Sequence, residues 1–376
     1  MQLTARQLNR STLARQMLID RHPLTIPEAI KRIVALQAQE PASPYIAMWN
    51  RIAPFDPGEM DRAFAEYEIV KASLMRITLH AVHADDYTRF HQSVLYALRA
   101  SRLNDRRFAE TGMTVAEADA LIPALIEFGR EPRTKAEIEE LIGDLLGGEV
   151  HPRVWWALRT FAPMTHAPFD GAWAFGRKQM FRTAPTLPER VDRVESTRAL
   201  LTRYLRGFGP ASRHDFGRFT MMAQVMVKEA LEGMRDLVRS EGPGGVELFD
   251  VPDGHVPDED LPAPPRLMAM WDSVLLAYDD RSRVLPDEYR KIVIRSNGDV
   301  LPTILVDGRV AGVWRHLEGA IEATAFQTLS AGDWEGLAVE AAGLLDLLAD
   351  RDDAVYRRYA RWWDKLPAGE VRRLPG

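Results

Sequence analysis

The stretch Leu36-Gln37-Ala38-Gln39-Glu40-Pro41 places two amide side chains on either side of one alanine, just before a proline. Pro41 disfavours helical geometry at Glu40, so a helix that enters this stretch is expected to end near residues 38–40. Residues two apart in a helix point about 200° away from each other. Gln37 and Gln39 therefore face one cleft only if the backbone leaves the helix between them. Two polar amides at a forced helix end are the leading candidate for a functional site.

A helix is expected directly before this stretch. Thr25 and Glu28 have the Ser/Thr-x-x-Glu spacing of a capping box, which starts a helix. The apolar residues that follow form one stripe at i, i+3 and i+4: Ile30, Ile33 and Val34. Gln37 lies seven residues after Ile30 and continues the stripe. A purely structural role stays open, because a glutamine amide near a helix C-terminus can satisfy carbonyl groups that lack helical partners.

The composition is that of an ordinary globular protein. The length of 376 residues allows about two or three domains, and 46% hydrophobic and 27% charged residues are typical of soluble chains. The N-terminus lacks the basic-then-apolar layout of a signal peptide, and no apolar run is long enough to span a membrane, so we expect a cytoplasmic protein. The absence of cysteine excludes disulfides, thiolate-held clusters, zinc knuckles and a cysteine nucleophile.

Charge is distributed unevenly along the chain. The formal net charge is −6, yet residues 151–240 carry 15 Lys and Arg against 8 Asp and Glu. Residues 241–270 then carry one Arg against 7 acids. A localised phosphate-binding face would leave this asymmetry, and so would a solvated surface of mixed charge.

The order of predicted elements repeats. A capping box at Thr4 and Gln7 opens a helix to about residue 21, the Thr25 helix follows, and Asp56-Pro57 starts a third. Residues 69–83 predict two strands around Met75-Arg76, and a long helix follows to about residue 105. Three helices and a hairpin are the order of a winged helix. Helices over 114–128, 134–146 and 152–161 precede a hairpin predicted over 164–176 around Asp170-Gly171, and helices from 194 to about 239 precede a short β segment.

The last third of the chain turns toward strands. The Pro-rich acidic segment 242–265 marks a boundary, an apolar strand is expected over 274–277, and Asn297-Gly298 and Asp307-Gly308 predict turns between strands over 291–296, 300–306 and 310–316. Helices over 334–350 and 353–365 close the chain. We therefore predict a mainly helical α+β protein with three tandem winged-helix units (residues 1–110, 111–190 and 191–260), and a small antiparallel β portion with closing helices over 261–376.

Further residue groups are weaker candidates. His80, His83, Asp85 and Asp86 are metal-ligand types, but His80 and His83 fall on opposite faces of one strand, so strand-end polarity and a helix cap are preferred to a metal. Arg281 and Arg283 could clamp phosphates or belong to a solvated turn. Trp155 and Trp156 beside arginines suggest base stacking or a core-facing helix. Gly-rich phosphate loops and a Gly-x-Ser-x-Gly elbow are absent.

Six stretches resemble the bacterial winged-helix DNA glycosylases of the AlkZ type, in the same order along nearly the whole chain. They are HPLT (22–25), LQAQEPASPY (36–45), MRITLH (75–80), YLRGFGPA (204–211), DDRSR (279–283) and LVDGRVAG (305–312). The resemblance implies three winged helices around a DNA-sized concavity. It also implies removal of N7-alkylated guanine, including the unhooking of interstrand crosslinks. Gln37 and Gln39 match the Gln-x-Gln motif of this type, whereas the Asp of a related Gln-x-Asp branch is absent, so that branch's substrates are not carried over.

The resemblance gives the two amides a chemical role. An N7-alkylated guanine is cationic and leaves as a neutral base, so no strong general acid is needed. The remaining task is to place a water near C1′ of an oxocarbenium-like sugar. A Gln carbonyl can accept a hydrogen bond from that water, although it cannot act as a true base. We expect Gln37 and Gln39 to position the water and Arg76, Arg281 and Arg283 to hold phosphates, with no metal and no cofactor. Arg76 could equally be a surface residue at the end of a strand.

The expected partner is duplex DNA carrying alkylated or crosslinked guanine, bound by a monomer. The competing interpretation is a non-catalytic winged-helix DNA-binding protein, either a regulator or a lesion binder. Release of free base from N7-methylguanine DNA separates the two, because salt-dependent binding alone is common to both.

Overall fold

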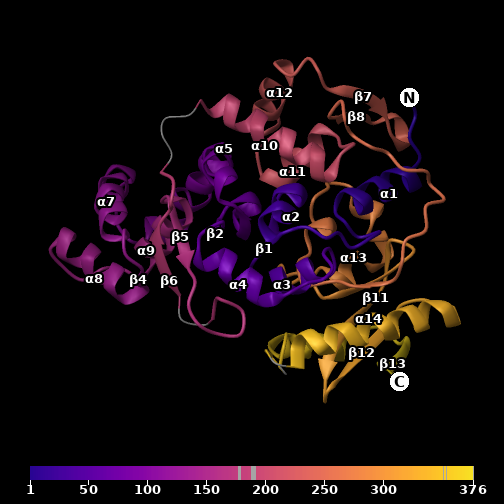
Figure 1. Cartoon of the computed structure of the whole chain (residues 1–376). Coiled ribbons are helices and arrows are strands. Elements are labelled where there is room, and N and C mark those ends of the chain that lie inside the picture. The colour runs from indigo at the N-terminus through magenta and orange to yellow at the C-terminus, as the bar shows by residue number, and fades with distance from the viewer. Residues whose placement is uncertain (177–178, 188–191, 350, 353, 376) are drawn as a thin grey trace.

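The computed structural model describes residues 1–176, 179–187, 192–349, 351–352 and 354–375. It is an α+β structure with two antiparallel sheets, of six and of five strands, and a separate two-stranded hairpin. The helices between residues 115 and 161 form a lobe at the left of Figure 1. Among the described residues, no helix combines the length and the apolar character that crossing a membrane requires.

Four helices open the chain, and local caps start three of them. Thr4 with Gln7 and Thr25 with Glu28 form complete capping boxes, and the Asp56 side chain accepts from the Gly58 amide. The helices are α1 (Ala5–Arg15), α2 (Ile26–Ile33), α3 (Ser43–Trp49) and α4 (Pro57–Ala65). The predicted first helix is therefore shorter than expected, and α3 was not predicted, since its N-terminal residue Ala42 makes no side-chain cap.

The six-stranded sheet joins segments from two of the predicted units. Its strand order is β1-β3-β2-β5-β6-β4. The strands are β1 (Leu36–Gln37), β2 (Ile69–Ser73), β3 (Leu79–His83), β4 (Arg133–Thr134), β5 (Met164–Ala167) and β6 (Met180–Thr183). Lys71 on β2 pairs with His166 on β5, so the sheet continues across the boundary predicted at residue 110. β1 lies at one edge.

Five helices cover the region between β3 and β5. They are α5 (Ala84–Leu103), α6 (Arg106–Ala109), α7 (Val115–Phe128), α8 (Lys135–Leu146) and α9 (Arg153–Phe161). Thr114 with Glu117 and Thr134 with Glu137 form capping boxes, which explains why the starts of α7 and α8 can be read from the sequence.

A third group of helices lies at the top of Figure 1 with a hairpin beside it. It consists of α10 (Arg193–Phe208), α11 (Arg213–Thr220), α12 (Gln224–Glu232), β7 (Val238–Glu241), the 3₁₀ turn η2 (Pro243–Gly245) and β8 (Glu247–Asp250). The boundary predicted between residues 190 and 191 lies outside the described residues. The order of three helices and a hairpin agrees with the predicted pattern, and its assignment to the winged-helix fold stays a prediction.

The C-terminal part builds the five-stranded sheet, in the order β13-β12-β11-β10-β9, with one long helix against it. Its elements are β9 (Arg266–Leu267), η3 (Ser273–Leu275), η4 (Arg281–Arg283), α13 (Asp287–Val293), β10 (Thr303–Val306), β11 (Arg309–Leu317), β12 (Ala320–Ala325), α14 (Ala331–Ala349), η5 (Arg357–Lys365) and β13 (Glu370–Leu374). One hydrophobic core combines side chains from residues 13–81 with others from 267–374, so the two ends of the chain fold against each other.

Four element predictions are wrong. Residues 273–275 form a 3₁₀ helix, not a strand. Asp170-Gly171 is not the turn of a two-stranded hairpin, because β5 pairs with β6, which begins only at Met180. Residues 287–293 form α13, with acids in its first turn and bases in its last turn, which favours a helix over the predicted strand. The closing segment is a 3₁₀ helix over 357–365 followed by β13, and Asp353 lies outside the described residues.

Candidate active site

The helix before the two glutamines ends earlier than the proline predicts. α2 stops at Ile33, and Val34 has φ 77° and ψ −59°. The Ala35 amide donates to the Ile33 carbonyl over 3.0 Å, which closes a γ-turn of the rare, strained kind. Ser273 then donates from its hydroxyl to the Ala35 carbonyl over 3.1 Å. The predicted end near residues 38–40 is therefore wrong, because tertiary contacts hold a turn that Val34 would not adopt alone.

Residues 36–37 form the edge strand β1 in place of the helix end. Gln37 pairs with His80 on β3, and the Ala38 amide donates to the Leu79 carbonyl over 2.8 Å. The strand ends at Gln37 and the chain bends at Gln39, while Ala38 is fully buried between the two glutamines. Gln37 is 4% exposed, whereas Gln39 is exposed to solvent.

Arg76 fixes the orientation of the Gln37 amide. Its Nη2 donates to Gln37 Oε1 over 2.6 Å and lies 3.1 Å from His80 Nε2. His80 Nδ1 lies 3.1 Å from the Thr78 carbonyl oxygen, which can only accept, so Nδ1 carries the proton and Nε2 is the acceptor. Burial and the nearby Arg76 lower the pKa of His80 well below its usual range, so His80 is neutral. One guanidinium nitrogen thus holds both an amide oxygen and a neutral imidazole.

The loop that carries Arg76 is strained. Arg76 and Ile77 both have positive φ values, 53° and 60°, which are unfavourable for a β-branched residue such as Ile77. Val34 also has a positive φ, so three residues with positive φ lie on the two segments that meet at Gln37. Strained backbone of this kind clusters at functional sites, because the surrounding structure has to hold it in place.

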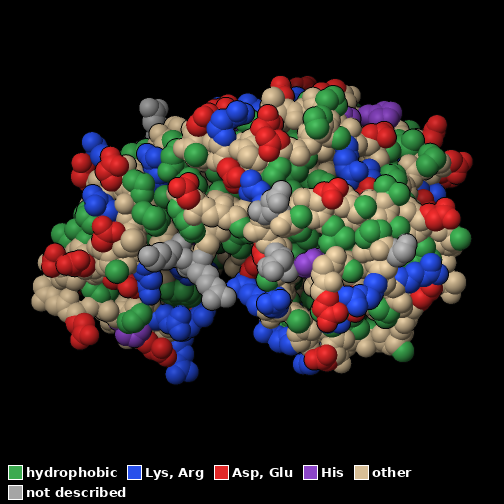
Figure 2. Space-filling model, turned by 60° about the horizontal axis from the view of Figure 1, so that its bottom comes forward, with side chains coloured by type: hydrophobic (Ala, Val, Ile, Leu, Met, Phe, Trp, Pro, Cys, Tyr) green, Lys and Arg blue, Asp and Glu red, His purple; other side chains and the backbone are tan. Residues whose placement is uncertain are grey.

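Arginines from two other segments act on Arg76, and a further arginine acts on one of these. Burial first, and then Arg281 and Arg218, lower the pKa of Arg76 to about 9. Burial, Arg290 and Arg218 lower the pKa of Arg281 to about 10. Arg218 thus acts on both Arg76 and Arg281, and a cluster of like charges in a partly buried site is stabilised by an anion. Figure 2 shows Lys and Arg side chains along both sides of a notch between two lobes of the surface.

Arg218 and Arg290 were not among the predicted site residues. Arg218 belongs to the basic segment 151–240, so the charge asymmetry pointed to its region. It could not point to the residue, because only the fold brings α11 toward the loop that carries Arg76 and α13 toward Arg281.

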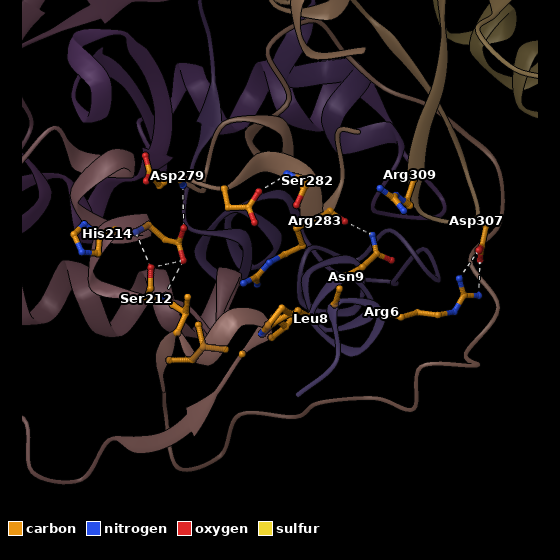
Figure 3. A pocket seen from close by; sticks show the side chains of 17 residues that line it. Arg6, Leu8, Asn9, Ser212, His214, Asp279, Ser282, Arg283, Asp307 and Arg309 are labelled. Carbon is orange, nitrogen blue, oxygen red and sulfur yellow. Dashed lines mark hydrogen bonds and ion pairs between the residues drawn. The ribbon is translucent and has the colours of Figure 1, made fainter. Parts of the chain in front are cut away.

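Arg283 does not join this group, although it lies two residues after Arg281. Its guanidinium lies 4.0 Å from the centre of the Tyr278 ring and donates to the Pro210 carbonyl over 3.0 Å. It points into a separate cavity of about 500 Å³ beside α1 and α11 (Figure 3). Four carboxylates line this cavity with Arg283: Asp215, Asp279, Asp280 and Asp307. The structure therefore separates Arg283 from the other two predicted phosphate ligands.

Glu40 ties the end of the Gln-x-Gln stretch to the C-terminal part. Its carboxylate accepts from Tyr359 Oη over 2.9 Å and from Arg358 Nη2, both in η5. Sequence reasoning missed this contact, which joins residues more than 300 positions apart.

The other candidate groups take structural roles. The His83 imidazole caps α5 by accepting from the Asp85 amide over 3.1 Å. In the described part of the chain, no three His, Asp or Glu side chains come together as a metal-binding group. Trp155 is buried in the core, as a core-facing helix predicts, while Trp156 is partly exposed.

Comparison with known proteins identifies the family of the protein that carries this site. The model of the DNA glycosylase AlkZ-like family matches residues 30–347, which contain both glutamines and every arginine of the cluster. The chain belongs to the AlkZ-like DNA glycosylase family. It is 23% identical over 367 residues to the interstrand DNA cross-link repair glycosylase of Streptomyces sahachiroi, covering 91% of this chain and 94% of that protein. The solved structure of the DNA glycosylase AlkZ from the same organism matches with a TM-score of 0.78 at 21% identity, over 94% of this chain and 98% of that one.

This AlkZ-like protein is accordingly a DNA glycosylase, a hydrolase that acts on N-glycosyl bonds, and its substrate is DNA. The structural match also confirms the predicted α+β class and the likeness to AlkZ along nearly the whole chain.

Proposed function

We propose that this protein is a monofunctional glycosylase that removes N7-alkylated guanine and unhooks interstrand crosslinks made through that atom. One observation carries the proposal. Arg76 fixes the buried Gln37 amide two residues before the exposed Gln39, and Arg281 and Arg218 lie near enough to lower the pKa of Arg76. The cross-link repair activity named for the Streptomyces sahachiroi relative supports the same substrate class.

The chemistry requires little acid–base assistance. Alkylation at N7 makes guanine a cation, so the base departs neutral when its bond to C1′ breaks, and the sugar develops oxocarbenium character. Water then attacks C1′ and loses a proton to solvent. The Gln37 oxygen keeps one lone pair after accepting from Arg76, and that lone pair can orient the water. Gln39 makes no hydrogen bond to the described residues, so its amide is available to the same water or to the sugar.

The arginines divide into two roles in this proposal. Arg76 positions Gln37, which replaces the phosphate contact predicted for it. The DNA phosphates are held by Arg281, Arg218 and Arg290. These arginines do not contact the damaged base, because the N7-alkylated base is itself a cation and would be repelled by them. The phosphate contact predicted for Arg283, and the predicted cytoplasmic monomer with three winged helices, remain predictions.

The test is excision from duplex DNA that carries N7-methylguanine, followed by alkaline cleavage at the abasic sites. We expect Gln37→Ala/Gln39→Ala to lower the single-turnover rate by at least about 100-fold, the loss typical of removing a positioned polar group. Gln327→Ala, at an exposed glutamine in a bend after β12, is the matched control and should keep the wild-type rate.

Excision that survives in the double variant would remove the two amides from the mechanism. If the wild-type protein released no base from N7-methylguanine DNA but unhooked a crosslinked duplex, the substrate would narrow to crosslinks. Release from neither would reject the proposed substrate class.

A further inference from the structure

Three guanidinium groups gather around one indole ring on α9. Trp155 packs into the core with its ring centre 5.1 Å from that of Phe181, whereas Trp156 lies at the surface. The guanidinium carbons nearest the Trp156 ring centre are those of Arg107, Arg102 and Arg153, at 4.5, 4.6 and 5.6 Å. We refer to Arg102, Arg107, Arg153 and Trp156 as the Trp156 cluster. None of the four was assigned a role at the Gln-x-Gln site.

The fold assembles this cluster from three elements. Arg102 lies in the last turn of α5, and its Nε donates to Thr160 Oγ1 over 2.9 Å. Arg107 comes from the short α6, and Arg153 is the first residue of α9. The guanidinium groups are therefore held side by side by packing of separate helices and not by their sequence spacing.

Positive charge exceeds negative charge in the cluster. Arg107 pairs with Asp105 through two hydrogen bonds of 2.9 and 2.6 Å. Arg102 and Arg153 form no ion pair with a carboxylate in the part of the chain that the structure describes. Burial and the neighbouring Arg107 and Arg159 lower the pKa of Arg102, which is the signature of cations crowded together. Such crowding is relieved by an external anion.

We propose that the Trp156 cluster is a second contact for duplex DNA that binds backbone phosphates away from the damaged base. This inference rests on the proposed function, because it takes the substrate duplex as the partner. Guanidinium groups form two parallel hydrogen bonds to a phosphate, and stacking on an indole holds their planes in place beforehand. The cluster has no set of amide side chains that would read base edges, so its binding is independent of sequence.

The length of α5 gives the distance between the Trp156 cluster and the strand β3 beside Gln37. α5 begins directly after β3, the strand that pairs with Gln37, and Arg102 lies 18 residues from the start of that helix. At about 1.5 Å per residue, this separates the cluster from the start of α5 by about 27 Å. A duplex rises by about 3.4 Å per base pair, so the distance corresponds to roughly eight base pairs. A duplex of about 30 base pairs is long enough to reach both sites.

The experiment compares two pairs of substitutions that remove the same charge. Arg107→Gln/Arg153→Gln acts inside the cluster. Arg106→Gln/Arg130→Gln is the control, since both of its arginines are strongly exposed, 91% and 72%, and neither stacks on Trp156. Dissociation constants for an undamaged duplex of about 30 base pairs are measured by fluorescence anisotropy between about 50 and 200 mM salt.

We expect the cluster variant to lower the slope of log K against log salt by about 1.8, which is about 0.9 for each of the two phosphates that it no longer neutralises. The control pair should keep a slope close to that of the wild type. Arg107→Lys/Arg153→Lys should keep most of the wild-type slope, because lysine retains the positive charge. Equal slopes in the two glutamine variants would overturn the proposal. A cluster that bound an acidic peptide such as polyglutamate, while DNA affinity stayed at the control value, would equally overturn it in favour of a protein partner.

These readouts are independent of catalysis. Binding of undamaged DNA requires no excision, so a protein that failed to release N7-methylguanine could still show the slope change. A catalytically active protein with unchanged slopes would retain its proposed function and lose only this second contact.

Discussion

The contact between Arg76 and Gln37 is the smallest unit on which the proposed mechanism depends. A single nitrogen of Arg76 contacts both Gln37 Oε1 and His80 Nε2, and desolvation keeps His80 neutral so that it can accept. A protonated His80 would repel Arg76 and release the amide. The orientation of Gln37 therefore follows from a burial effect on the pKa of a residue that need not touch the substrate.

Arg76→Met should slow excision by about 10- to 100-fold, because it leaves a buried amide oxygen without a partner at a cost of about 1–3 kcal/mol. Dissociation constants for undamaged DNA and their salt slope should change little. Arg281→Met is the contrasting variant, since it should weaken binding and reduce the slope by about 0.9. A salt slope lowered equally by Arg76→Met would return Arg76 to the predicted phosphate role.

Gly207 provides a second residue-scale prediction. A Cβ atom at this position in α10 would lie 2.6 Å from Val34 Cγ2, in the strained turn before Gln37. Gly207→Ala should therefore lower the free energy of unfolding by about 1–3 kcal/mol, even though alanine favours helices. Gly148→Ala, where a Cβ meets nothing within 4 Å, is the control. Urea unfolding measures both, and equal midpoints would show that Val34 can move at no cost.

At the scale of elements, the start or end of a helix could be predicted from the sequence only where the residues that determine it are close together in the chain. The capping boxes and the proline-initiated α4 were predictable, because the groups that start those helices lie within four residues of each other. The end of α2 was not, since its turn depends on Ser273 and on Gly207. For the same reason Gln37 and Gln39 could be chosen from the sequence, while Arg76 as the partner of Gln37 could not.

The bond between Glu40 and η5 is the element-scale contact open to test. Glu40→Gln and Tyr359→Phe each weaken the link that joins the Gln-x-Gln stretch to the C-terminal part. We expect each to lower the excision rate by about threefold to tenfold, and the double variant to lose no more than the worse single variant, because both remove one interaction. Thermal unfolding midpoints should stay within a few degrees. Rate losses that multiply in the double variant would show that the two residues act separately.

For the whole molecule, buried neutral histidines predict sensitivity to acid. Burial lowers the pKa of His91 to about 4 and lowers those of His80 and His166 well below 6.5. The unfolded chain binds protons below about pH 6.5 while the folded chain does not, so the stabilising effect is complete above that pH and is lost as pH falls toward 4.

Between about pH 7.5 and about pH 5, His91 alone should lower the free energy of unfolding by about 2 kcal/mol. His91→Gln keeps a donor for the Phe161 carbonyl that His91 Nε2 contacts, and it cannot titrate. The variant should therefore lose about 2 kcal/mol less than the wild type over this range, as measured by urea unfolding at both pH values. Identical losses would place the acid sensitivity in other groups.

The core that combines residues 13–81 with residues 267–374 also sets the order of events during translation. At about 5–20 residues per second, Arg281 leaves the ribosome roughly 10–50 s after Gln37, and β13 is the last described strand of its sheet to be made. A nascent chain therefore carries the Gln-x-Gln stretch and its partner strand β3 for many seconds before Arg281 and the C-terminal sheet exist. The Gln-x-Gln stretch meets Arg218, Arg281 and Arg290 only after most of the chain has been made, so a partly synthesised chain lacks the complete candidate site.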